Sequence, residues 1–75
     1  MNARSPTNLS WNLRLLRHRV GLNQAQLATQ VGCRNNAISL YESGRIEPTL
    51  RIGARLAKVL GVSVDTLLGE RLPPC

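Results

Sequence analysis

The sequence predicts a small all-α domain built from five short helices. Apolar residues recur at helical spacing between Leu9 and Leu68, and no stretch alternates as a strand would. Residues that cap helix starts, such as Asn23, Thr49 and Ser63, precede several of these segments, and glycines follow them. A chain of 75 residues has room for one domain with a modest core. We therefore expect a single domain over residues 1–75, with an ordered core at about 8–69 and frayed tails.

The first helix is expected to start near Asn8 or Ser10 and to end at Gly21. Its apolar residues recur at i, i+4, i+7 and i+11, which places them on one face. That face consists of Leu9, Leu13, Leu16 and Val20.

Two shorter helices follow, joined by a tight turn. Asn23 and Gln26 form a capping-box pattern at the start of a helix that runs to about Val31. Gly32 supplies the positive-φ position that ends it. The next helix runs from about Asn35 to Glu42 and turns Ile38 and Tyr41 inward, which leaves its other face exposed. That exposed side, with the turn before it, consists of Arg34, Asn35, Asn36, Ser39 and Leu40.

A fourth and a fifth helix complete the domain. Pro48 prevents the third helix from continuing, and Thr49 can cap a helix over residues 50–60. Its inward residues are predicted to be Leu56, Ala57, Val59 and Leu60. Ser63 can cap a last short helix over residues 64–68, which Gly69 ends.

The composition restricts the function. Residues 1–41 hold five arginines and no acid, whereas residues 42–75 hold five basic and four acidic residues. A polyanion is the natural partner of the basic half. Two cysteines (Cys33, expected to be buried, and Cys75) and one histidine form neither a disulfide framework nor a zinc site, and no nucleophile–base cluster suggests an enzyme. With no signal sequence and no apolar run of about 18 residues, we expect a cytoplasmic protein without a membrane contact.

One ion pair is predicted from burial. Arg17 lies beside the apolar face of the first helix, and Glu42 lies beside the buried face of the third. Since a charge on a core face normally needs a partner, we expect these two side chains to pair and to hold the two helices together.

These residues resemble the phage-repressor and Cro-like family of helix-turn-helix proteins, also called the xenobiotic-response-element type. The resemblance covers about three quarters of the chain. The matching residues are Leu16, Arg17, Asn23, Gln24, Ala25, Gln26, Leu27, Ala28, Val31, Gly32, Ile38, Glu42, Ser43, Gly44, Pro48 and residues 56–63. The family implies a compact five-helix, lambda-repressor-like DNA-binding domain whose second and third helices form the motif. The family's Arg–Glu pair falls on Arg17 and Glu42.

The resemblance also implies which residues meet double-stranded DNA. The base-contacting positions are Arg34, Asn35, Asn36, Ser39 and Leu40, and the phosphate-contacting positions are Asn23, Gln24, Ser43, Gly44 and Arg45. Leu40 departs from the family, which commonly has a long polar or basic residue there, and we expect it to pack on a thymine methyl group. Glu47 is a second departure, because the family often has a basic residue near that position. We expect an acid there either to weaken binding to the DNA backbone or to turn away from the duplex.

The family usually binds DNA as a homodimer and implies a transcription regulator without cofactor, metal or small-molecule ligand. The apolar residues expected at the dimer interface are Val62, Val64, Leu67, Leu68 and Leu72. The alternative is that most of them complete the monomer core. Two other readings stay open: an antitoxin that also binds a toxin, and a restriction–modification controller protein. A regulator of any kind can also touch RNA polymerase.

Overall fold

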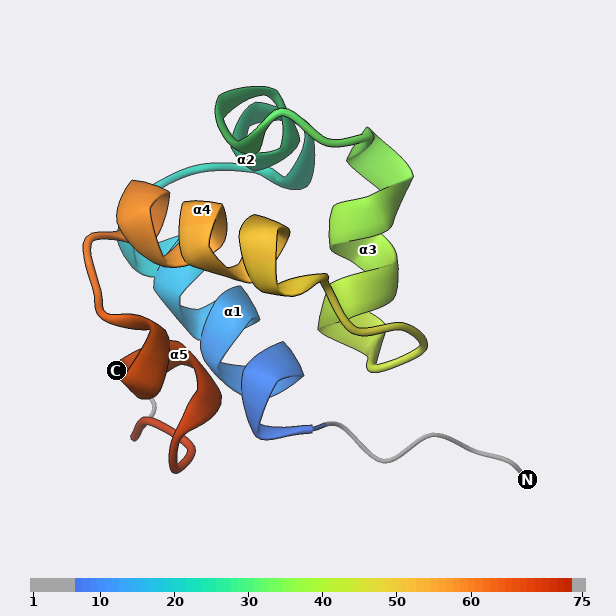
Figure 1. Cartoon of the computed structure of the whole chain (residues 1–75). Coiled ribbons are helices and arrows are strands. Elements are labelled where there is room, and N and C mark those ends of the chain that lie inside the picture. The colour runs from blue at the N-terminus through green and yellow to red at the C-terminus, as the bar shows by residue number, and fades with distance from the viewer. Residues whose placement is uncertain (1–6, 74–75) are drawn as a thin grey trace.

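The structure is a computed structural model, and it describes residues 7–73. These residues form five α-helices: α1 (Asn8–Arg19), α2 (Gln24–Val31), α3 (Asn35–Ser43), α4 (Leu50–Leu60) and α5 (Val64–Leu68). Helix α1 packs against α3 on one side and α5 on the other, while α2 packs against α3 and α4 (Figure 1). The predicted all-α class is confirmed, and the helix bounds lie within about two residues of those expected.

The helices begin where the sequence supplies a cap. The side chains of Thr7, Asn23, Thr49 and Ser63 each accept a hydrogen bond from the backbone N–H three residues ahead. Such a contact satisfies one of the donors that a helix start leaves unpaired. Helix α3 has Arg34 at this position and no side-chain cap.

The core lies where the five helices meet. Its buried apolar residues are Leu9, Leu13, Leu16, Leu27, Ala28, Val31, Ile38, Tyr41, Leu56, Ala57, Leu60 and Leu67. Val59, expected inside, is only half-buried against this cluster. Val20 was also expected there and is exposed, because α1 ends at Arg19 and Val20 lies beyond its last turn.

A buried polar residue holds the C-terminal segment against α1. Asn12 is fully buried, and its amide nitrogen lies 3.3, 3.0 and 3.1 Å from the carbonyl oxygens of Thr66, Leu67 and Glu70. Its Oδ1 accepts a hydrogen bond of 2.8 Å from the N–H of Leu72. The neighbouring Trp11 donates from Nε1 to the carbonyl of Leu72 at 2.9 Å.

The expectation that the tail is frayed is therefore wrong for residues 70–72. A single buried amide can satisfy several backbone groups at once, and such groups are costly to leave unpaired away from water. The Arg71 guanidinium also lies over the Trp11 ring, 5.6 Å from its centroid. Cys75 and Arg4 lie outside the described residues.

The burial of α5 corrects part of the expected dimer interface. Leu67 has no exposed surface and belongs to the monomer core, so it cannot lie on an interface. Val62, Val64 and Leu72 are half-buried against the same core, and Leu68 is 52% exposed. The short last helix thus buries most of its apolar surface in the core of this small domain.

Candidate nucleic-acid interface

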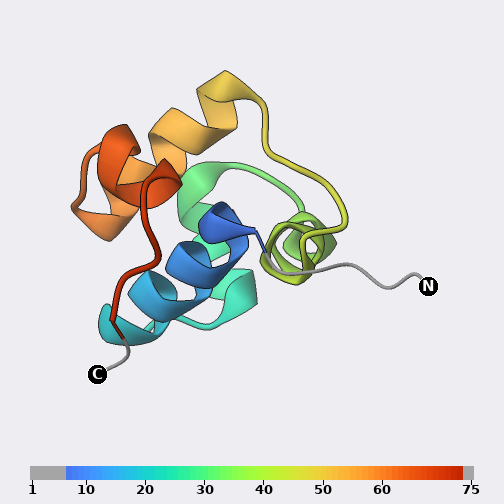
Figure 2. The same ribbon diagram turned by 90° about the horizontal axis from the view of Figure 1, so that it is seen from below.

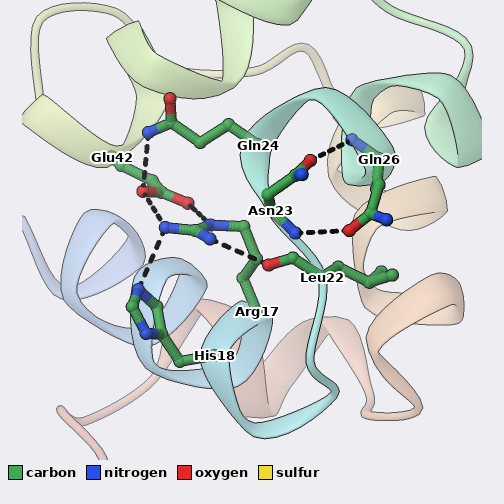
Figure 3. Close-up of polar contacts among 7 residues, drawn as sticks. All are labelled: Arg17, His18, Leu22, Asn23, Gln24, Gln26 and Glu42. Carbon is green, nitrogen blue, oxygen red and sulfur yellow. Dashed lines mark hydrogen bonds and ion pairs between the residues drawn. The ribbon is translucent and has the colours of Figure 1, made fainter.

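Local hydrogen bonds fix both ends of α2, and the end at Gly32 forms the corner between α2 and α3. Asn23 and Gln26 exchange two hydrogen bonds at the start of α2: Gln26 N–H donates to Asn23 Oδ1 at 2.7 Å, and Asn23 N–H donates to Gln26 Oε1 at 2.8 Å (Figure 3). At the other end, Gly32 has φ of 85° and its N–H donates to Ala28. That conformation strains any residue with a side chain, so the glycine fixes the direction in which the chain enters α3.

Helix α3 buries one side and exposes the other. Ile38 and Tyr41 lie in the core. The side predicted to meet bases is Arg34, Asn35, Asn36 and Ser39, all exposed, with Leu40 half-buried. Helix α3 forms one outer edge of the molecule, opposite α5, with α1 between them (Figures 1 and 2). The amides and guanidinium near its start can therefore reach a large partner.

The predicted ion pair between α1 and α3 is present. Arg17 Nε contacts Glu42 Oε2, and Arg17 Nη2 donates to Glu42 Oε1 at 3.1 Å, which makes the pair bidentate (Figure 3). The exposed fractions of the two side chains are 10% and 6%. Two hydrogen bonds to a planar guanidinium fix orientation as well as distance, so the pair sets how α3 lies on α1.

The sequence did not indicate how many groups join this pair. Arg17 Nη1 donates to the carbonyl of Leu22 at 2.9 Å, and its Nη2 lies 3.1 Å from His18 Nε2. Gln24 donates from Nε2 to Glu42 Oε1 at 3.1 Å. Since Leu22 and Gln24 flank the start of α2, one buried guanidinium ties α1, α2 and α3 together (Figure 3).

The C-terminal end of α3 carries the second group of expected phosphate contacts. Ser43 Oγ donates to the carbonyl of Leu40 at 2.9 Å, and Gly44 ends the helix with φ of 78°. Arg45 is exposed just beyond it, as is Glu47. This end of α3 thus presents one cation and one acid.

The turn residue Cys33 is half-buried rather than fully buried. Desolvation raises the pKa of its thiol above the ordinary value, and a hydrogen bond from its own backbone only partly opposes this. The pKa of Tyr41 is raised as well, mainly by burial and secondly by the nearby Cys33. Both groups are therefore neutral at pH 7, and neither adds negative charge beside the exposed face of α3.

The described part of the chain brings together no metal-ligating cluster: across residues 7–73, no three His, Cys, Asp or Glu side chains meet. In the same range, no helix is both long and apolar enough to cross a membrane.

Comparison with known proteins decides the family. A helix-turn-helix domain family matches residues 8–69, which include all five helices and the α2–α3 corner. The chain belongs to this helix-turn-helix family. An uncharacterized HTH-type transcriptional regulator of Archaeoglobus fulgidus is 33% identical over 55 residues, covering 73% of this chain and 79% of that protein. This helix-turn-helix protein is thus a DNA-binding protein of the transcription-regulator type.

Solved structures show the same fold. The P22 c2 repressor, crystallised with synthetic operator 9T, is 35% identical with a TM-score of 0.78, covering 80% of this chain and 91% of that one. The restriction–modification controller protein C.AhdI of Aeromonas hydrophila is 28% identical with a TM-score of 0.77, covering 81% and 92%. The five-helix arrangement of this helix-turn-helix protein is therefore lambda-repressor-like.

An enzyme also contains this fold. Hydroxypropylphosphonic acid epoxidase from S. wedmorenis is 29% identical with a TM-score of 0.77 over 91% of this chain, but the match covers only 36% of the epoxidase chain. The likeness is confined to the epoxidase's helix-turn-helix part. The family itself is one of transcription regulators and is not enzymatic.

Proposed function

We propose that this protein regulates transcription by binding operator DNA sequence-specifically as a homodimer, with α3 in the major groove. It would act in the cytoplasm, where bacterial and phage operators lie, and would need no cofactor or small-molecule ligand. The observation that supports this most is the exposed face of α3, where an arginine, two asparagines and a serine stand clear of the core. The operator-bound P22 c2 repressor, which has the same fold, supports the same mode of binding.

Each residue of that face has a defined chemistry toward bases. Asn35 and Asn36 can each make two hydrogen bonds to an adenine, and Arg34 can bind guanine or a phosphate. Ser39 can donate to or accept from a base edge. Leu40 cannot hydrogen-bond, and its half-buried side chain is proposed to pack on a thymine methyl group.

Phosphate contacts are proposed at both ends of the motif. Asn23 and Gln24 lie at the start of α2, where free N–H groups and the helix dipole favour an anion. Because the Gln24 side chain already donates to Glu42, its contribution would come mainly from the backbone N–H. Ser43, Gly44 and Arg45 would hold the DNA backbone at the other end.

The homodimer would place two copies of α3 in successive major grooves. A two-fold dimer reads a pseudo-palindromic operator with half-sites about 34 Å apart, one turn of DNA.

A second candidate is a restriction–modification controller, because C.AhdI aligns over 92% of its own chain. This role uses the same DNA contacts and differs in genomic setting: an adjacent methyltransferase and endonuclease would favour it. An adjacent toxin gene would instead favour an antitoxin. Contact with RNA polymerase would be a further property of either regulator.

Selection of bound sites from random duplexes tests the proposal. The protein is incubated with a pool of randomised duplexes at about 100–200 mM salt, where the affinity of non-specific phosphate binding is reduced. The bound fraction is then sequenced. We expect an enriched motif with two-fold symmetry. Uniform recovery of all sequences would contradict sequence-specific binding.

A further inference from the structure

The outward side of α1 carries the single tryptophan of the chain. Trp11 is 38% exposed, although most of the surface of a tryptophan is normally buried. Arg14 lies three positions further along the helix and is exposed as well. Residues three apart on a helix are neighbours on its surface, so the ring and the guanidinium share one face. Tryptophan and arginine are enriched among the residues that dominate protein–protein binding energy, which makes this face a candidate contact surface.

The Trp11 side chain is held in one position by the segment after α5. Its Nε1 donates to the carbonyl of Leu72 at 2.9 Å, and the Arg71 guanidinium lies 5.6 Å from the ring centroid. Arg71 is held in turn, because its Nε donates to Asn8 Oδ1 at 3.2 Å. We call Trp11, Arg14 and Arg71 the α1 outer patch. Side chains that are already fixed lose less conformational freedom when a partner binds, so the exposed ring is preorganised for contact.

The charge at the α1 outer patch is positive. Residues 7–41 contain four arginines and no acid. Within residues 7–73, the Arg14 side chain forms neither an ion pair nor a hydrogen bond. Glu70 is the acid nearest to the patch in the sequence, and it is exposed and forms no ion pair in the same range. Two cations beside an apolar ring therefore suit a partner that presents carboxylates next to an apolar side chain.

The patch lies away from the face proposed to bind DNA. Arg71 and Leu72 belong to the segment after α5, which runs alongside α1 on the side opposite α3 (Figure 2). With α3 in a major groove, a partner on the α1 outer patch would not compete with the duplex for the same surface. An acidic partner at this patch is therefore better explained as a protein than as the operator.

We propose that the α1 outer patch docks an acidic segment of another protein. Trp11 covers an apolar side chain of that segment, and Arg14 and Arg71 meet its carboxylates. The inference goes beyond the proposed function and does not depend on it, because the contact needs no DNA. Three side chains cover far less than the roughly 800 Å² per partner of a standard interface, so the contact is weak and reversible.

Titration with a pair of peptides tests this. The probe is a peptide in which leucine is flanked by glutamates, and the reference is the same peptide with glutamine in place of each glutamate. Both are titrated into the full chain at about 150 mM salt, where long-range attraction between exposed charges is screened. Binding is followed through the amide NMR signals of the protein. The glutamate peptide should bind about tenfold more tightly than the reference. The signals that shift should belong to α1 and residues 70–72 rather than to α3.

Single variants separate the charged contact from the apolar one. Arg14→Gln should lower the affinity for the glutamate peptide several-fold and leave that for the reference unchanged, because it removes only a charge. Trp11→Ala should lower both affinities alike. Arg45→Gln removes an exposed arginine beyond α3, so it is the matched control and should change neither affinity. Circular dichroism confirms that each variant is folded, and Arg14→Gln leaves the contacts with the C-terminal segment in place.

Three results would overturn the inference. The first is a glutamate peptide that binds no more tightly than the reference. The second is an equal loss of affinity in Arg14→Gln and Arg45→Gln, or shifts centred on α3, because the peptide would then follow only the overall positive charge. The third is a weaker affinity of Arg14→Gln for duplex DNA with a salt slope reduced by about one unit, which would assign the patch to the DNA backbone. All three leave the proposed function standing, since selection from random duplexes tests that separately.

Discussion

Arg17 is the residue that connects the fold to the face proposed to bind DNA. Its guanidinium contacts Glu42 on α3, the carbonyl of Leu22 before α2 and His18 on its own helix. Removing a charge from water is costly, and only a partner with good geometry compensates for it. The bidentate contact provides that geometry, so the position of α3 depends on both partners being present.

The first prediction concerns the loss of either partner. Arg17→Ala and Glu42→Ala should each lower the free energy of unfolding by about 3–5 kcal/mol, because each leaves an unpaired charge in a poorly solvated position. Urea unfolding followed by circular dichroism measures this. Glu47→Ala, which removes an exposed acid that forms no ion pair among residues 7–73, is the matched control and should change stability by no more than about 0.5 kcal/mol. Equal effects from Glu42→Ala and Glu47→Ala would mean that the pair contributes nothing.

The second prediction concerns the Cys33 thiol. Its pKa is raised in the folded chain, so folding favours the protonated thiol. This stabilisation is complete below the unfolded pKa and is lost as the pH rises through the folded pKa. In a Cys75→Ser background, Cys33 should therefore react with iodoacetamide at pH 8 more slowly in the folded protein than in the protein unfolded in urea. The midpoint of its rate against pH should also lie higher than in urea. A folded midpoint at or below the unfolded one would contradict this.

At the scale of the helices, local signals in the sequence were sufficient for most of the fold. The helix bounds follow from caps and glycines, which act within three or four residues: Asn23 with Gln26, and Gly32 after Val31, are examples. The Arg17–Glu42 pair was predictable because a charge on an apolar face implies a partner. These features depend on spacing along the chain, which a single sequence displays directly.

What the sequence did not reveal depends on contacts between distant segments. In the sequence, Asn12 resembles an ordinary polar helix residue, yet its side chain forms hydrogen bonds with residues more than fifty positions away. For the same reason the tail was expected to fray and Leu67 was assigned to an interface. The extra partners of Arg17 also require knowledge of how three helices meet. In the site, the exposed face of α3 was predictable from periodicity, but the half-burial of Leu40 was not.

The third prediction concerns the contact between α1 and the C-terminal segment. Asn12→Ala leaves the N–H of Leu72 and the carbonyls of Thr66, Leu67 and Glu70 without this partner. The free energy of unfolding should fall by about 1–3 kcal/mol. Amide exchange at Leu72 should also accelerate, since its N–H loses the Asn12 acceptor. Gln30→Ala, an exposed amide on α2, should change neither quantity. Unchanged exchange at Leu72 would show that the segment is held by other contacts.

At the scale of the whole molecule, the structural role and the proposed DNA-facing role are divided between two sides of α1. One side holds α5 and the tail through Asn12, and the other holds α3 through Arg17. The residues proposed to read bases lie beyond this second side and contribute little to the core. Their substitution should therefore leave the fold intact and change only the interaction with DNA, which allows a direct test.

The fourth prediction tests the central claim that the start of α3 reads bases. Site selection is repeated with Asn35→Ala, Asn36→Ala and Arg45→Ala. The affinity of each variant for the selected duplex is also measured from about 50 to 200 mM salt, because phosphate contacts weaken over this range. Each asparagine variant should lose preference at defined base pairs, worth about 1–3 kcal/mol of discrimination, with the salt dependence unchanged. Arg45→Ala should weaken binding to all sequences and reduce the salt slope by about one unit. Asparagine variants that keep the full base preference would contradict the claim.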